Sequence, residues 1–157
     1  MAHRSAKRSA GFLIHRRIGE QREVLLVHPG GPVWAKRDAG AWSIPKGEIE
    51  LDEEPLAVAR REFTEELGLA PPAGEVVELG EIRQAGGKLV VAWAIEGTVD
   101  VTHIVSNQFE MEWPPRSGRT AEYPEVDRAE WFDLDTAREK LNAAQAAFLD
   151  RLLTQAP

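Results

Sequence analysis

The stretch that decides the fold is "REFTEELG", residues 61–68. Glu62, Glu65 and Glu66 place three carboxylates within five residues, and the stretch ends on Gly68. On a helix, residues three and four apart face one another, and like charges at these spacings repel. The sequence therefore poses a question: what favours three negative charges on one face?

The residues around this stretch predict an α-helix over 56–67. Apolar side chains at helical spacing form one stripe that we expect to face the core: Leu56, Ala59, Phe63 and Leu67. Pro55 suits a first helical turn, where its missing N–H is not needed. Gly68 suits the left-handed residue that ends many helices, with Leu69 folding back onto the last turn.

Two explanations of the glutamate cluster remain open at this point. A solvated helix face would tolerate the three carboxylates, because charge-rich faces are common on protein surfaces. A hard divalent cation would instead convert the repulsion into coordination, since Mg²⁺ takes oxygen ligands. Only Arg60 and Arg61 offer positive charge nearby in the sequence.

The spacing of residues outward from the helix separates the two explanations. The pattern is Gly47, five residues, Glu53, seven residues, Arg61-Glu62-Phe63, one residue, Glu65-Glu66, one residue, Gly68-Leu69. It resembles the Nudix box at all nine defining positions, which are spread over 23 residues. So many spaced positions are far more specific than a lone short motif.

This resemblance implies a fold and a metal site. The implied fold is an α/β (α+β) domain, an α/β/α sandwich with a mixed central sheet, over residues 1–157, with 1–8 as a flexible basic N-terminus. The implied cofactor is Mg²⁺, with Mn²⁺ as the alternative. It is held against a pyrophosphate by the Gly47 carbonyl and by four carboxylates: Glu62, Glu65, Glu66 and Glu125.

Catalytic roles also follow from the resemblance. Glu62 is expected either to bind metal or to act on the attacking water, because members of the family differ in which glutamate is the base. Arg61 is expected to pair with Glu53 or Glu62 and to fix their rotamers. Its alternative is an ordinary surface arginine, which would contribute little.

A distal carboxylate is predicted in the polar loop 113–127. Glu125 lies six residues before Trp131, a spacing that resembles the end of this loop in the family. Glu122 is the second choice. The alternative is that both are simply polar loop residues.

Several residues are candidates for substrate binding. The sequence "PKG", residues 45–47, resembles the branch of the family that includes dinucleoside polyphosphate and diphosphoinositol polyphosphate hydrolases. The ammonium group of Lys46 could reach a phosphate or remain solvated. Arg116 and Arg119 could close over a long phosphate chain from their loop. Trp34 and Tyr123 are the aromatic candidates for stacking on a base.

The rest of the chain predicts strands over 9–16, 23–29, 75–84, 88–97, 102–113 and 129–134, with a short strand at 42–44 inside a loop of residues 30–48. A final helix is predicted from a cap at Asp135 to about Leu153. Trp93 is the tryptophan expected in the core.

Composition limits the function classes. A chain of 157 residues without cysteine and with net charge −7 predicts a soluble, cytoplasmic protein with no disulfides, no thiol nucleophile and no membrane span. General nucleic-acid binding is not expected, because affinity for phosphate backbones comes largely from Lys and Arg.

The sequence thus predicts a Mg²⁺-dependent hydrolase of phosphoanhydride bonds in nucleoside diphosphate-linked small molecules. Dinucleoside polyphosphates or nucleoside triphosphates are the leading substrates. The alternatives are a nucleotide-sugar or diphosphoinositol polyphosphate hydrolase, and a non-catalytic module that senses a nucleotide. Neither oligomeric state nor the exact substrate can be read from the residues.

Overall fold

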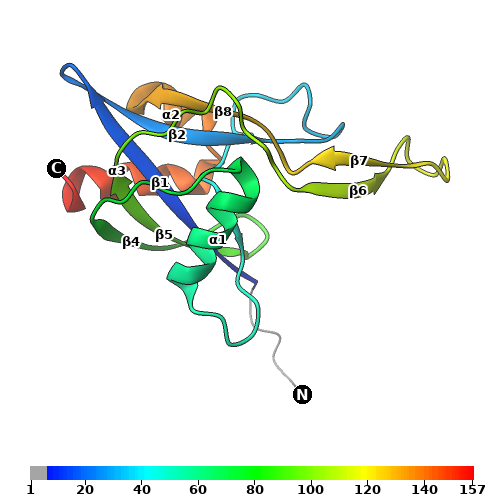
Figure 1. The fold of residues 1–157 in the computed structure, drawn as a ribbon, viewed down its shortest axis with the longest axis horizontal. Helices are drawn as coiled ribbons and strands as arrows, with labels where there is room; N and C mark the ends of the chain where they lie inside the picture. The colour runs from blue at the N-terminus through cyan, green and yellow to red at the C-terminus, as the bar shows by residue number, and fades with distance from the viewer. Residues whose placement is uncertain (1–6) are drawn as a thin grey trace.

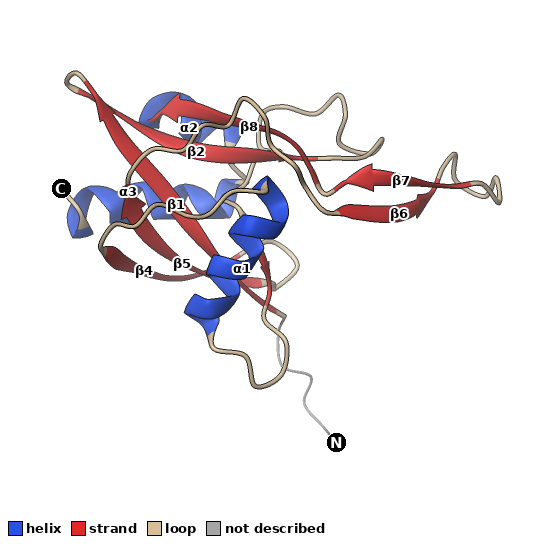
Figure 2. Cartoon of the chain, in the orientation of Figure 1, coloured by secondary structure: helices blue, strands red, loops and turns tan. Residues whose placement is uncertain are grey.

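A computed structural model describes residues 7–157 and shows one mixed sheet with a separate hairpin (Figures 1 and 2). The strands of the sheet run in the order β4 (Val76–Arg83), β5 (Leu89–Glu96), β1 (Arg8–Ile18), β2 (Gln21–Pro29) and β8 (Val126–Asp133), and β3 (Lys46–Glu48) pairs with β1. The pairing of β1 with β5 is parallel, whereas the other pairings are antiparallel. Strands β6 (Gln108–Glu112) and β7 (Thr120–Pro124) form the hairpin.

Helices cover both faces of the sheet, because successive residues of a strand point to opposite faces. On one face, Phe12 and Ile14 of β1 pack with α1 (Pro55–Leu67). On the other face, Leu13 packs with the layer formed by α2 (Leu134–Lys140), the 3₁₀ turn η1 (Ala143–Gln145) and α3 (Ala146–Gln155). The predicted α/β/α arrangement with a mixed central sheet is confirmed.

Helix α1 begins and ends at the predicted residues. Pro55 is its first residue, and the side chain of Glu54 accepts hydrogen bonds from the N–H groups of Leu56 and Ala57. Gly68 adopts φ 70° and donates its N–H to the Thr64 carbonyl. The buried face also contains Glu66, which is only 8% exposed, so one glutamate of the cluster is not on a solvated face.

The prediction of one continuous C-terminal helix is wrong, because the helix is interrupted at Leu141. That residue is extended, with ψ 147°, and the carbonyl of Trp42 accepts the N–H of Asn142. The Asn142 side chain then caps η1 by accepting a hydrogen bond from the N–H of Ala144. Asn side chains often bond to nearby backbone groups in this way, in competition with the hydrogen bonds of a continuing helix. Asp133, not Asp135, is the N-cap of α2 and accepts the Thr136 N–H at 2.8 Å.

Three strand predictions also need correction. Only 108–112 of the segment 102–113 is a strand, and β7 lies inside the predicted polar loop; the resulting hairpin projects from the body of the molecule (Figure 1). At 42–44 there are only isolated bridges, whereas β3 occupies 46–48. β8 begins at Val126, three residues before the predicted start.

The buried tryptophan is Trp42, at 1% exposure, whereas Trp93 is only half-buried. Of the predicted flexible N-terminus, residues 1–6 lie outside the described residues, and Arg8 already belongs to β1, where it pairs with Leu89. Within residues 7–157, no helix is long and apolar enough to cross a membrane.

Candidate active site

Five carboxylates line one cavity of about 350 Å³ beside β3 and α1. Three come from the last turns of α1 (Glu62, Glu65 and Glu66), Glu48 comes from β3, and Glu125 comes from the junction between β7 and β8. Gly47 and Lys46 of β3 form another wall of this cavity. The structure therefore brings together the residues that the sequence assigned to the metal, and their roles remain a prediction.

Glycine is required at position 47 because the Glu62 side chain lies very close to its Cα atom, and not because of a special backbone angle. A Cβ atom at this position would overlap the carboxyl group of Glu62. The carboxylate thus lies directly over the β3 backbone, which is where a carbonyl and a carboxylate could share one ligand. A side chain at position 47 would displace Glu62.

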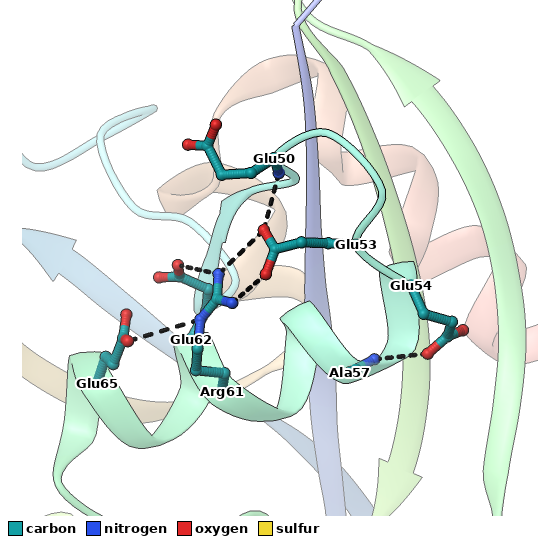
Figure 3. Close-up of polar contacts among 7 residues, drawn as sticks. All are labelled: Glu50, Glu53, Glu54, Ala57, Arg61, Glu62 and Glu65. Atoms are coloured by element: carbon teal, nitrogen blue, oxygen red, sulfur yellow. Dashed lines mark hydrogen bonds and ion pairs between the residues drawn. The ribbon is translucent and has the colours of Figure 1, made fainter.

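Arg61 stands at the centre of an ion-pair network (Figure 3). Its guanidinium pairs closely with Glu53, lies 3.5 Å from Glu62, and lies 3.6 Å from Glu65 across one helical turn. Glu53 in turn accepts the N–H of Glu50 at 2.9 Å. Arg61 holds the pKa of Glu53 below its usual value, mainly through their hydrogen bond. This arrangement fits the predicted orienting role of Arg61.

Burial makes the ionised form of these glutamates unfavourable. It raises the pKa of Glu66 to about 8, against the attraction of Lys46. The pKa values of Glu62 and Glu125 are also raised, by burial first and then by repulsion from Glu65. A bound cation would favour the ionised carboxylates and lower these pKa values.

Backbone hydrogen bonds fix the position of Glu125. Its N–H donates to the Asn107 carbonyl at 2.8 Å, and its own carbonyl accepts from Gly30 at 2.9 Å. Asn107 also donates its N–H to the Glu65 carbonyl at 2.9 Å, so the chain around Glu125 is tied to the end of α1. Glu122, the second choice, lies opposite Glu110 in the hairpin and does not line this cavity.

The chemistry of the donor set fits a hard divalent cation. Carboxylates and a backbone carbonyl are the oxygen ligands that Mg²⁺ prefers, and Mg²⁺ keeps several waters rather than needing a complete protein cage. Within residues 7–157 no three acidic or histidine side chains already stand close enough to hold an ion. Binding would therefore draw the carboxylates together from their positions around the cavity.

A second cavity, of about 250 Å³, adjoins the first. The two share Lys46, Glu66 and Glu125. Trp34 lines the second cavity, and Arg37 lies 5.3 Å from the centre of its indole ring. The arrangement places a predicted stacking residue and a predicted phosphate-binding lysine beside the carboxylates.

The sequence did not single out the polar side chains of this second cavity. Gln84 follows β4, Asn142 caps η1 and Gln145 ends it, so two segments distant in sequence meet at one wall. No short motif links them, and only the buried position of Gln145 marks it as unusual for a glutamine.

The remaining predicted substrate residues lie outside both cavities. Tyr123 packs on Phe109 within the hairpin, with ring centres 6.1 Å apart. Arg116 and Arg119 lie in the turn between β6 and β7, at the far end of the projecting hairpin (Figure 1). The structure does not bring these three side chains to the carboxylates.

Comparison with known proteins identifies the family. The NUDIX domain model matches residues 7–152. The RNA pyrophosphohydrolase of Bartonella henselae is 26% identical over 150 residues, which is 83% of this chain and 78% of that protein. The RNA pyrophosphohydrolase of Hahella chejuensis is 43% identical over 56 residues, but this match spans only 34% of this chain and 35% of that protein.

Solved structures share the fold. A C. elegans Ap4A hydrolase, solved as a binary complex, superposes with a TM-score of 0.67 at 20% identity, covering 95% of this chain and 96% of that one. The NUDIX domain of Shewanella oneidensis NrtR, solved with ADP ribose, gives 0.66 at 17% identity, covering 97% and 89%. The motif, the mixed sheet and these matches agree: the chain belongs to the Nudix family.

Proposed function

We propose that the protein is a Mg²⁺-dependent hydrolase of dinucleoside polyphosphates or nucleoside triphosphates. The observation that carries the proposal is the continuity of the two cavities. Glu66, Glu125 and Lys46 belong to both, so a nucleotide with its base near Trp34 can present its phosphates to the carboxylates. Nudix enzymes generally depend on a divalent metal, and Mn²⁺ is the alternative ion.

The metal would be held by the Gly47 carbonyl and by four carboxylates: Glu62, Glu65, Glu66 and Glu125. A bound divalent cation neutralises phosphate charge and lowers the pKa of a coordinated water.

Proton transfer would fall to one of the carboxylates. A general base works best with a pKa near the working pH, and burial raises the pKa of Glu62 from its ordinary value. Arg61 and Glu53 would hold Glu62 in one rotamer through the network of Figure 3. We therefore place the base at Glu62, with Arg61 and Glu53 as positioning residues.

Substrate contacts would come mainly from the cavity walls. Lys46 would bind a phosphate oxygen, and Trp34 would stack on a base. Arg116, Arg119 and Tyr123 are weaker candidates, because they reach the substrate only if the hairpin closes over it.

A second candidate function is removal of pyrophosphate from the 5′ end of RNA. It rests on the relatives named RNA pyrophosphohydrolase, of which the Bartonella protein matches over most of this chain. The net charge of −7 disfavours extensive contact with an RNA backbone, so we place small nucleotides first. The ADP-ribose complex of a structural neighbour keeps nucleotide sugars among the alternatives.

A hydrolysis screen tests the proposal. The panel contains dinucleoside polyphosphates, nucleoside triphosphates, ADP-ribose and nucleotide sugars, inositol pyrophosphates and a 5′-triphosphate RNA, each with Mg²⁺ and with EDTA. We expect the highest kcat/KM for a dinucleoside polyphosphate or nucleoside triphosphate. A preference for RNA would favour the second candidate, and no hydrolysis of any compound would refute the catalytic proposal.

A further inference from the structure

We infer that the second cavity selects 6-oxopurine bases, such as guanine and hypoxanthine, over adenine. The inference rests on the proposed function, since it assigns the base of a substrate whose phosphates occupy the carboxylate site. It follows from a chain of hydrogen bonds that begins at a backbone N–H and leaves amide donors at the cavity wall.

The backbone fixes the orientation of Gln145, which is 1% exposed. The N–H of Ile44 can only donate, and it lies 3.0 Å from Gln145 Oε1. The amide nitrogen of Gln145 must therefore face the other way. There it donates to Ser43 Oγ at 3.0 Å and to Gln84 Oε1 at 2.8 Å, which uses both of its hydrogens.

Gln145 in turn fixes the orientation of Gln84. Because the oxygen of Gln84 accepts from Gln145, this oxygen faces Gln145, and the NH₂ group of Gln84 faces the other way, where it can donate to a ligand. Asn142 is fixed in the same way, since its Oδ1 accepts the N–H of Ala144 at 3.1 Å. Ser43 offers no free donor, because its hydroxyl donates to the Ile44 carbonyl.

The cavity wall therefore presents two amide donors to a ligand, and both Gln84 and Asn142 line it. The guanine edge that carries N7 and O6 has two neighbouring acceptors, whereas the adenine edge has the N7 acceptor beside the N6 donor. Adenine would place its N6 amino group against an amide NH₂ of the cavity wall, so that two donors face each other. One of them would be left without a hydrogen-bond partner, which costs free energy away from water.

The size and the stacking residue fit one base. The cavity volume of about 250 Å³ lies below the roughly 300–1,000 Å³ of pockets for drug-sized ligands, so it suits one nucleoside rather than a dinucleotide. Trp34 lines the same cavity and supplies an aromatic face. A second nucleoside of a dinucleoside polyphosphate would lie outside.

Calorimetric titration with GMP, IMP and AMP tests the inference without relying on turnover. We expect GMP and IMP to bind at least about tenfold more tightly than AMP, as for other bidentate readouts of guanine. IMP lacks the guanine 2-amino group, so its inclusion separates recognition of N7 and O6 from recognition elsewhere on the base. Hydrolysis of GTP, ITP and ATP should follow the same order.

Gln84→Glu provides the decisive variant. One carboxylate oxygen can still accept from Gln145, while the other becomes an acceptor where the wild type has a donor. The preference for GMP over AMP should therefore shrink at least tenfold or reverse. Gln21→Glu, an exposed change at the start of β2 and the opposite end of that strand from the cavity, adds the same charge and should leave the ratio unchanged.

The outcomes separate this inference from the proposed function. Equal binding of GMP and AMP, tighter binding of AMP, binding of neither, or an unchanged ratio in Gln84→Glu would overturn the base assignment even if hydrolysis is found. Guanine selectivity in binding, together with no hydrolysis of any nucleotide, would uphold the base assignment and refute the catalytic proposal alone.

Discussion

Replacing Glu66 by Gln should stabilise the metal-free protein and abolish its response to Mg²⁺. Glu66 is 8% exposed, and burial raises its pKa from the ordinary 4.5 to about 8. At about 1.4 kcal/mol for each pH unit between these values, ionised Glu66 costs the fold at most about 5 kcal/mol. Because local relaxation offsets part of this cost, we expect Glu66→Gln to stabilise by about 1–3 kcal/mol.

The sign of the pH dependence follows from the raised pKa. Between pH 4.5 and about 8 the folded state holds a proton on Glu66 that the unfolded state has lost. Metal-free stability of the wild type should therefore fall as pH rises through this window and level off above it. The advantage of Glu66→Gln should be small near pH 5 and full above pH 8.

Thermal denaturation in EDTA and in Mg²⁺ measures both effects. At roughly 2–4 °C for each kcal/mol in a domain of this size, Glu66→Gln should melt about 2–12 °C higher in EDTA at pH 8. Added Mg²⁺ should raise the Tm of the wild type, because a ligand of the folded state stabilises it. Glu122→Gln, outside the cavity, should behave as the wild type. A lower Tm of Glu66→Gln in EDTA, or a wild-type rise with Mg²⁺ that Glu66→Gln retains, would refute the reasoning.

Three further predictions follow from the site. Glu125→Gln should lower kcat/KM about a hundredfold or more, whereas Glu122→Gln should change it little; the reverse order in steady-state assays would misplace the distal carboxylate. Gly47→Ala should lower kcat/KM by a similar factor, because the new Cβ would displace Glu62, while circular dichroism shows a folded protein. Turnover equal to that of the wild type would show that Glu62 does not need the space above Gly47. Lys46→Ala should reduce the ratio of kcat/KM for dinucleoside polyphosphates to kcat/KM for nucleotide sugars, and added salt should do the same by screening the lysine. Arg119→Ala should reduce this ratio less than Lys46→Ala does. Equal reductions by the two substitutions would show that the hairpin closes over the substrate.

Local pattern was sufficient for α1 because its signals agree with one another. Pro55, the apolar stripe and Gly68 each specify the helix independently, and the spacing of the box adds positions that no helix requires. Glu125 could be chosen over Glu122 from its distance to Trp131, and the structure places Glu125 alone of the two in the cavity.

Tertiary contacts decided what the pattern could not. The apolar spacing of the last helix continues through Leu141, but the backbone pairing of Trp42 with this segment interrupts the helix there. The polar wall formed by Gln84, Asn142 and Gln145 depends on two distant segments meeting, so no local spacing predicts it. Exposed loop arginines look like phosphate ligands in a sequence, yet Arg116 and Arg119 lie at the far end of the hairpin (Figure 1).

The most direct test of the central claim is the hydrolysis rate of a dinucleoside polyphosphate in three successive conditions: Mg²⁺, excess EDTA, and Mg²⁺ restored. The account predicts turnover with Mg²⁺, loss of turnover in EDTA, and recovery when Mg²⁺ is returned, because in the proposed mechanism a cation offsets the repulsion between the cavity carboxylates and a polyphosphate. Full activity in EDTA would contradict the metal-dependent mechanism.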